Sequence, residues 1–356
     1  MEGQKLIVFL SFFCLLLFSF LPGGQASSHA AAHGGRLHRF HPKKIFVFGD
    51  SYSDTGNTPK SDSSAWKVPY GTTFPGKPAG RFSDGRILID LLARALGLRS
   101  PVPYKWMKYA PDRLLKYGMN FAHGGTGVFE TLSTGPNLTA QIHQLSSLVN
   151  NGSVFTTEDL QSALALVTVA GNDYSAYLAK GGSLQDLPPF ITSVVNQLAV
   201  NLKSIHAMGL KRVAVGALQP LGCLPTITFA NSFQQCNSTV NAAVDFHNSL
   251  LQQAVAKLNN DSHSNSSYFI IDLHSPFISV LNKTGNGDDQ FETPLKPCCL
   301  GVSAEYSCGS VDKEGAKMYR ECSNPEAAFF WDLFHPTQAG WNAVFQLLKS
   351  NLLGRI

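Results

Sequence analysis

The earliest candidate for covalent chemistry is Ser51, which stands just after a short apolar run at residues 45–48. The run predicts a buried β-strand, and Gly49 marks its end. A serine at the carboxyl end of a central strand lies where open α/β sheets expose reactive groups. A nucleophilic serine needs a general base and an oxyanion hole, so the rest of the chain must supply both. From this segment alone, Ser51 could equally well cap a following helix.

A segment near the end of the chain offers the base. His335 stands three residues after Asp332 and directly before Pro336, which suits the first turn of a helix with an apolar face at residues 341–348. A neutral imidazole can take the serine proton and later return it to a leaving alkoxide, while a carboxylate orients the ring and stabilises the imidazolium. On its own, an Asp-x-x-His-Pro segment more often marks a capped helix start than half of a triad.

Two further loops could supply hydrogen-bond donors. Residues 120–127 contain Gly124 and Gly125, and their glycines let backbone amides approach a ligand closely. This loop lacks the Lys-Ser/Thr ending and the GxGxxG spacing of nucleotide-binding loops. Asn172 follows an apolar run at residues 164–169 that is typical of an interior parallel strand. A lone Gly-Asn-Asp segment is usually a turn, so the combination of these loops is stronger evidence for an active site than any one of them.

In chain order, the motifs are Gly-Asp-Ser, Gly-Gly, Gly-Asn-Asp and a late Asp-x-x-His-Pro, and this set closely resembles that of the GDSL esterase/lipase family of the SGNH hydrolase superfamily, and within it the plant-type group. The resemblance covers residues 43–350. Further support comes from residues 80–86, residues 220–225 and the adjacent pair Cys298 and Cys299. The GxSxG elbow of α/β-hydrolases is absent, which counts against that fold.

The resemblance implies a role for each triad residue, with Ser51 as the nucleophile, His335 as the general base and Asp332 as its orienting partner. It implies that no metal or organic cofactor is needed. Its predicted oxyanion hole comprises the Ser51 amide, the Gly125 amide and the side-chain NH₂ of Asn172, and each such donor contributes about 10²–10³ in rate.

His123 departs from the plant pattern, in which a small residue such as serine is expected at this position. The departure leaves Gly124 as an alternative amide donor to Gly125. We expect His123 to be a packed or loop-bonded side chain rather than a second base.

Apolar runs predict the elements that must hold these residues. Strands separated by amphipathic helices indicate one α/β domain at residues 43–353, with a three-layer α/β/α, flavodoxin-like fold and a mostly parallel five-stranded sheet. The long loop at residues 55–86 is expected to form a wall of the substrate cleft or plain scaffold. The expected strands are residues 45–48, a segment ending at 120, and residues 164–169, 211–218 and 268–273, with helices at 87–98, 191–205, 240–258 and after 336.

The first 26 residues resemble a secretory signal peptide, with a lysine, an apolar run at residues 6–21 and a small-residue site. The run is short for a transmembrane helix, so we expect no integral membrane span, with an uncleaved anchor as the alternative. Residues 27–42 carry four histidines and are expected to be a flexible linker rather than a metal site. We therefore expect a secreted, extracellular protein of the apoplast or cell wall.

The cysteines and glycosylation motifs agree with that compartment. Six cysteines follow the predicted signal peptide, which suggests three disulfides, with Cys223–Cys236 as a local closure and the other four pairing among themselves. The net charge of +4 over 356 residues is mild and scattered, so nucleic-acid binding is not expected. N-glycans are possible at Asn137, Asn151, Asn237, Asn260, Asn265 and Asn282.

The sequence thus predicts a secreted, glycosylated serine esterase or lipase that acts on a small-molecule, lipid or polymer ester. An acyltransferase with the same triad is the alternative within that chemistry. A non-catalytic binding protein on the esterase scaffold is the alternative from another class. Lipids, cutin-like polyesters, acetylated polysaccharides and phenolic esters all remain open as substrates, and so does the oligomeric state.

Overall fold

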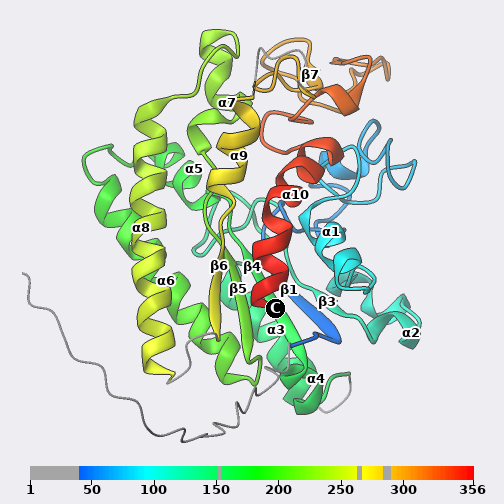
Figure 1. Cartoon of the computed structure of the whole chain (residues 1–356). Coiled ribbons are helices and arrows are strands. Elements are labelled where there is room, and N and C mark those ends of the chain that lie inside the picture. Colours follow the sequence, from blue (N-terminus) through cyan, green and yellow to red (C-terminus); the bar gives the residue numbers. More distant parts are fainter. Residues whose placement is uncertain (1–39, 151–153, 263–266, 284–289) are drawn as a thin grey trace, which may run out of the picture. The chain divides into compact units, whose positions relative to one another are not determined.

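A parallel sheet of six strands forms the centre of the computed structural model, which describes residues 40–150, 154–262, 267–283 and 290–356 (Figure 1). Five strands were predicted. The sixth, β2, has only two residues and includes a proline, so no apolar pattern marks it. The strand order is β2-β3-β1-β4-β5-β6. The strands are β1 (Lys44–Gly49), β2 (Val102–Pro103), β3 (Gly118–Asn120), β4 (Ala163–Thr168), β5 (Arg212–Gly216) and β6 (Tyr268–Ile271).

The side chains of β1 alternate between two separate cores, as a strand buried on both faces requires. Ile45 and Val47 pack in one core, whereas Phe46 and Phe48 pack in the other. Helices cover both faces of the sheet, which confirms the three-layer α/β/α architecture. The first face is covered by α1 (Leu88–Ala95), α9 (His274–Leu281) and α10 (Gln338–Arg355), and the second by α3 (Leu138–Asn150), α6 (Leu187–Ala207) and α8 (Ser238–Asp261) (Figure 1).

Short helices interrupt the loops of the remaining described chain. They are α2 (Asp112–Leu115), α4 (Thr157–Gln161), α5 (Asn172–Ala179) and α7 (Pro225–Thr228), with 3₁₀ helices at Ser64–Trp66, Tyr104–Tyr109, Leu221–Cys223, Phe229–Asn231 and Pro325–Ala327. None of the helices within the described ranges is long and apolar enough to cross a membrane. The predicted signal peptide and residues 27–39 of the predicted linker lie outside those ranges, as do Asn151 and Asn265.

One alternative and one prediction near the reactive residues were wrong. Residues 51–53 form turns and the next helical residue is Ser64, so Ser51 does not cap a helix. Pro336 does not lie in the first turn of α10, because Thr337 is the N-cap and its hydroxyl accepts the Gly340 amide at 2.9 Å. His335 therefore lies in the loop before α10 rather than at its start.

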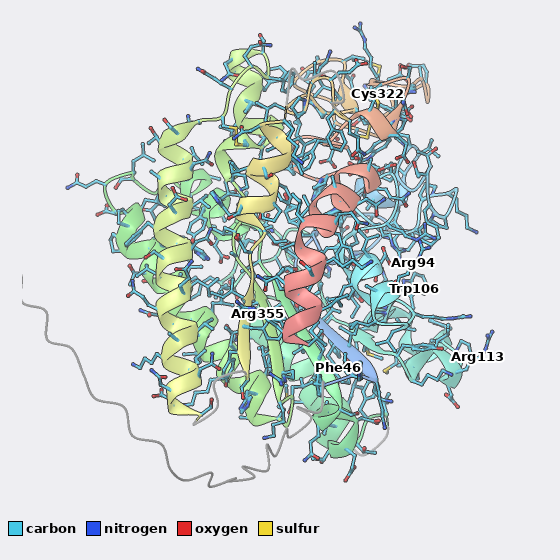
Figure 2. The ribbon with its side chains drawn as sticks, viewed as in Figure 1. Phe46, Arg94, Trp106, Arg113, Cys322 and Arg355 are labelled. Carbon is cyan, nitrogen blue, oxygen red and sulfur yellow. A yellow bond between two sulfur atoms is a disulfide. The ribbon has the colours of Figure 1, made fainter. Side chains whose placement is uncertain are left out.

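Three disulfides close loops on the outside of this fold. Cys223–Cys236 forms as predicted, and the other four cysteines pair as Cys298–Cys322 and Cys299–Cys308. The last two disulfides bracket a short antiparallel hairpin, and we call residues 298–322 the stapled segment; Cys322 is labelled at the upper right of Figure 2. The hairpin consists of β7 (Cys299–Gly301) and β8 (Tyr319–Glu321).

The sheet register brings the predicted loops to one edge. Val47 of β1 is level with Asn120 of β3, and Gly49 is level with Thr168 of β4. Because these neighbouring strands are parallel, their carboxyl ends lie side by side. The loops that carry Ser51, Gly125 and Asn172 therefore meet at this edge.

Gly49 permits the close approach of β1 and β4 at this edge. Its φ is +137°, and a Cβ built on it would lie 1.9 Å from the carbonyl oxygen of Thr168. We predict that Gly49→Ala lowers the free energy of unfolding by at least about 3 kcal/mol, through the backbone strain and the clash together. Urea unfolding followed by circular dichroism measures the loss.

Gly97→Ala is the matched control for that prediction. Gly97 also has a positive φ, +72°, but no neighbouring atom lies within 4 Å of the added Cβ. Its substitution should cost only about 1–2 kcal/mol, from the left-handed conformation alone. Equal losses in the two variants would contradict the account of the strand contact.

Candidate active site

Ser51, His335 and Asp332 form a continuous chain of hydrogen bonds. His335 Nε2 lies 2.8 Å from Ser51 Oγ, although the two residues are 284 positions apart in the sequence. On the other side of the ring, His335 Nδ1 lies 2.8 Å from Asp332 Oδ1 and 2.9 Å from Oδ2. All three residues are buried. The structure thus brings together the serine, imidazole and carboxylate that were predicted from separate motifs.

Asp332 is held as a carboxylate by its surroundings. The amides of Phe334 and His335 both donate to Oδ1 at 2.8 Å. Burial acts to raise the pKa of Asp332, but the neighbouring His335 and the hydrogen bonds outweigh it and keep that pKa below its usual range. A charged Asp332 can orient the imidazole through Nδ1 and stabilise its protonated form.

The loop at residues 80–86 fixes the segment that carries His335. The hydroxyl of Ser83 donates to the carbonyl of Pro336 at 2.9 Å, and the amide of Gln338 donates to Asp84 Oδ1 at 2.7 Å. The ring of Phe82 lies 5.1 Å from the imidazole, centroid to centroid, and lines the adjoining pocket. Phe82 therefore lines a pocket, while its neighbours Ser83 and Asp84 act as scaffold.

The Ser51 and Gly125 amides donate to no protein acceptor among the described residues, so both can donate to a ligand. The Gly124 amide is different, because it donates to Asp54 Oδ2 at 3.0 Å and to Thr58 Oγ1 at 2.8 Å. The geometry therefore favours Gly125 over Gly124 as the available amide. Gly125 also lines the same pocket as Ser51.

His123 is packed into the loop that carries these glycines. The side chain is buried, and Nδ1 lies 3.1 Å from the carbonyl oxygen of Gly124. The backbone of Gly135 approaches the ring so closely that an added Cβ there would lie 2.2 Å from Nδ1. These contacts match a packed, loop-bonded side chain.

Asn172 lines the pocket beside Ser51, but its side-chain amide already has two acceptors. Nδ2 donates to the carbonyl of Thr126 at 2.9 Å and to Asp50 Oδ2 at 3.1 Å. The amide has two hydrogens, and in this geometry both point to protein oxygens. Asn172 can therefore stabilise an oxyanion only by exchanging one of these bonds.

Asp50 is a buried carboxyl group directly beside the reactive serine. It accepts the amides of Tyr52 at 3.0 Å and Ala170 at 2.5 Å, in addition to Asn172. Burial raises the pKa of Asp50 to about 7, and the backbone hydrogen bonds only partly oppose that rise. Asp50 thus links the loop after β1 to the loop after β4.

Two residues that sequence reasoning missed hold the donor loops. Asp173 accepts the amides of Val128 and Phe129 at 3.0 and 2.8 Å, which ties the loop after Gly125 to α5. Gln141 of α3 bonds both the amide and the carbonyl of Gly49 at 2.8 Å. The Gly-Asn-Asp motif gave a signal for Asp173, whereas Gln141 is one polar residue in a helix and has no local signature.

Ser51 and His335 open onto an apolar pocket of about 310 Å³. A second, more polar pocket of about 620 Å³ adjoins it and shares Phe82, Gly125, Asn172 and Ser175. Ser51 and His335 therefore line the more apolar of two adjoining recesses. The apolar side chains of the first pocket include Tyr174, Leu178, Leu221, Leu224, Ile227, Val240 and Phe334.

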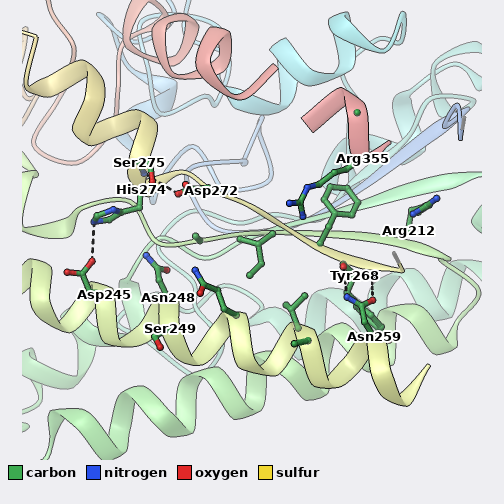
Figure 3. Close-up of a pocket in the computed structure, with 17 residues that line it drawn as sticks. Arg212, Asp245, Asn248, Ser249, Asn259, Tyr268, Asp272, His274, Ser275 and Arg355 are labelled. Atoms are coloured by element: carbon green, nitrogen blue, oxygen red, sulfur yellow. Dashed lines mark hydrogen bonds and ion pairs between the residues drawn. The ribbon is translucent and has the colours of Figure 1, made fainter. Parts of the chain in front are cut away.

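A larger recess lies elsewhere, along the outer edge of the sheet beside β6 and α8 (Figure 3). Asp245 and His274 point toward each other there, 3.6 Å apart, and Asn259 lies against Tyr268 at the other end. None of the triad residues lines this recess. Within the described ranges, no cluster of His, Cys, Asp and Glu could hold a metal ion.

Comparison with known proteins identifies the family of this chain. Residues 45–348 match the family model described as GDSL-like Lipase/Acylhydrolase, so the chain belongs to the GDSL esterase/lipase family of carboxylic ester hydrolases. One GDSL esterase/lipase of Arabidopsis thaliana is 52% identical over 346 residues, which is 96% of each chain, and a second is 48% identical over 99% of each chain.

More distant similarities extend to named esterases. Acetylajmalan esterase 2 of Rauvolfia serpentina is 30% identical over 87% of this chain and 90% of its own. Among solved structures, a carbohydrate esterase is 14% identical, with a TM-score of 0.40 over 87% of this chain and 66% of its own.

The raised pKa of Asp50 predicts a pH-dependent stability. Between about pH 4 and 7, the unfolded chain loses the Asp50 proton while the folded protein keeps it, so this group destabilises the fold progressively as pH rises. The free energy of unfolding of wild type minus that of Asp50→Asn should therefore fall over this range and level off above about pH 8. Urea unfolding at pH steps measures the difference, and a pH-independent value would contradict the assignment.

Proposed function

We propose that this family member is a secreted esterase that hydrolyses carboxylic esters through an acyl-enzyme on Ser51. The observation that supports the proposal most strongly is the hydrogen-bonded chain of Ser51, His335 and Asp332 beside an apolar pocket. The distances between the three side chains are those that nucleophilic catalysis requires.

The first half of the reaction transfers the acyl group to the enzyme. His335 Nε2 takes the proton of Ser51 Oγ as that oxygen attacks the ester carbonyl carbon, which gives a tetrahedral oxyanion. Asp332 stabilises the imidazolium through Nδ1. The imidazolium then protonates the leaving alkoxide as the C–O bond breaks. Water, deprotonated by the same imidazole, attacks the acyl-enzyme and releases the acid and free Ser51.

The oxyanion would first be stabilised by the amides of Ser51 and Gly125, because neither is engaged elsewhere in the described protein. Asn172 would join them by exchanging its longer hydrogen bond, to Asp50, for the oxyanion. Its bond to Thr126 would remain and hold the amide in the pocket. Charge that develops only in the transition state would thus gain two amides that are already oriented and one side chain that exchanges a hydrogen bond.

The two adjoining pockets suggest which part of an ester each receives. The apolar pocket beside Ser51 and His335 would hold an apolar acyl group. The polar pocket, which includes His123 and Thr131, would hold the more polar part of the ester. Substrates with one apolar and one hydroxylated part fit this arrangement best.

Secretion is supported by the signal-like residues 1–26 and by the three disulfides, which persist in oxidising compartments. Among the sequon residues in the described ranges, Asn237, Asn260 and Asn282 are exposed, so glycans could be attached there. We therefore propose an extracellular location, in the apoplast or cell wall.

The nucleophile assignment predicts that Ser51→Ala lowers kcat/KM for 4-nitrophenyl butyrate by at least ~10³-fold, because no other group can form the acyl-enzyme. The mature protein should be secreted from a eukaryotic host so that disulfides form. Ser53→Ala is the control, since Ser53 lies in the same loop but bonds Thr168 instead of the imidazole. It should keep activity within about tenfold of wild type.

Equal activity in wild type and Ser51→Ala would refute the assignment. Product analysis in the presence of an added alcohol separates the two reactions that the triad allows. Free acid is expected, whereas transfer of the acyl group to the alcohol would indicate an acyltransferase.

The pocket assignment predicts a change in chain-length preference. Ile227 lines the apolar pocket, so Ile227→Trp should reduce kcat/KM for 4-nitrophenyl octanoate at least about tenfold more than for the acetate. Leu184→Trp, at an exposed position outside the pocket, should leave the ratio of the two values unchanged. If Ile227→Trp also leaves the ratio unchanged, the acyl group binds elsewhere.

A further inference from the structure

The hydrogen-bonded chain of the proposed triad continues one step beyond Asp332. The hydroxyl of Tyr70 donates to Asp332 Oδ2 at 2.7 Å, across 262 positions of sequence. Tyr70 is almost completely buried, with 3% of its surface exposed. The long loop that begins after β1 therefore supplies a side chain to the far end of the triad and not only to the substrate cleft.

The two oxygens of Asp332 have different partners. Oδ1 accepts the amides of Phe334 and His335 as well as the imidazole N–H. Oδ2 accepts only the imidazole and Tyr70 within the described structure. Without the tyrosine hydroxyl, the only donor left for this buried oxygen would be the imidazole N–H, which Oδ1 also accepts. The carboxylate would then lose the one hydrogen bond that holds Oδ2 independently of His335.

Tyr70 is held in place from several directions. Its ring packs against Trp331 at 6.0 Å with an interplanar angle of 76°, and Trp331 directly precedes Asp332. Both rings lie in one core with the cysteines of the stapled segment. Tyr319 of that segment donates to the carbonyl of Val68 at 3.1 Å, which fixes the backbone just before Tyr70. The amide of Gly71, just after it, donates to Ser83 at 3.0 Å.

The hydroxyl is suited to be a permanent donor. Burial, reinforced by the charge of Asp332, raises the pKa of Tyr70 well above its ordinary value, so the proton stays on the oxygen. A donor on Oδ2 also draws negative charge away from the imidazole. The carboxylate then stabilises the imidazolium less than it would alone, and the imidazole remains a neutral base at lower pH.

We propose that Tyr70 is a positioning residue that fixes Asp332 and sets the pH above which His335 acts as a base. The inference rests on the proposed acyl-enzyme mechanism. The other titratable groups that act on this chain are Asp50 and Tyr52, both in the loop after β1. Asp50 and Tyr52 are both present in every variant at position 70. A shift in the pH profile between these variants can therefore be attributed to the hydroxyl of Tyr70.

The test compares the pH dependence of kcat/KM for 4-nitrophenyl acetate in wild type, Tyr70→Phe and Tyr319→Phe. In Tyr70→Phe, the midpoint of the acidic limb should move to higher pH by about 0.5–1 unit, because the carboxylate now stabilises the imidazolium more strongly. The value of kcat should fall about tenfold with KM within about twofold, because a positioning group acts on the chemical step.

Tyr319→Phe is the matched control. It removes a hydroxyl that bonds the same loop, at Val68, but does not reach Asp332. Its acidic limb should coincide with that of wild type. An equal shift in both variants, or no shift in Tyr70→Phe, would overturn the inference.

A second substitution gives the opposite sign and keeps the side chain's shape. Incorporation of 3,5-difluorotyrosine at position 70 makes the hydroxyl a stronger donor, so the acidic limb should move to lower pH. This variant can be measured even if Tyr70→Phe is too unstable to purify. An acidic limb that stays in place or moves to higher pH would contradict the inference. Ser51→Ala, assayed alongside, distinguishes the two failures. Full activity in it refutes the proposed function, whereas an inactive Ser51→Ala with an unshifted position-70 series refutes only the role of Tyr70.

Discussion

The hydrogen bond between Ser51 and His335 is the constraint on which the rest of the site depends. It joins a serine just after the central strand to an imidazole close to the end of the chain, at 2.8 Å. Neither residue lies in a helix or strand, so each must be fixed by its surroundings. Gly49 and Gln141 fix the strand end before Ser51, and the Ser83–Pro336 bond fixes the segment after His335. Packing of the sheet and α10 then brings these two loops together.

Buried carboxylates are the shared means by which these loops are fixed. Asp50, Asp54, Asp173 and Asp332 are all buried, and backbone amides donate to every one of them. Burying a carboxyl group is costly unless hydrogen bonds compensate, so each residue strongly favours the loop conformation that supplies its donors. In the proposed mechanism, these hydrogen bonds orient the donors and the base before an ester arrives, which is how preorganised sites stabilise developing charge.

Much of this arrangement could be predicted from the sequence, and the rest fails for identifiable reasons. Continuous apolar runs revealed the interior strands, and strand-end motifs revealed Ser51 and Asn172, because burial and turn chemistry are local. Strand β2 was missed because a strand of two residues is too short to show an alternation of apolar and polar side chains. The bond from Tyr70 to Asp332 and that from Gln141 to Gly49 were missed because each is a polar contact across a long stretch of chain. The choice of Gly125 over Gly124 as the free amide donor likewise required the structure, since it depends on which of the two amides donates to Asp54.

The most direct test of the central claim is the site of covalent labelling by a fluorophosphonate probe, mapped by mass spectrometry of proteolytic peptides. The account predicts one labelled residue, Ser51, and labelling that is strongly slowed in His335→Ala because the serine then lacks its base. Labelling should also be lost when the protein is denatured before the probe is added. A label on another residue, or labelling of Ser51 at the same rate in His335→Ala, would contradict the account.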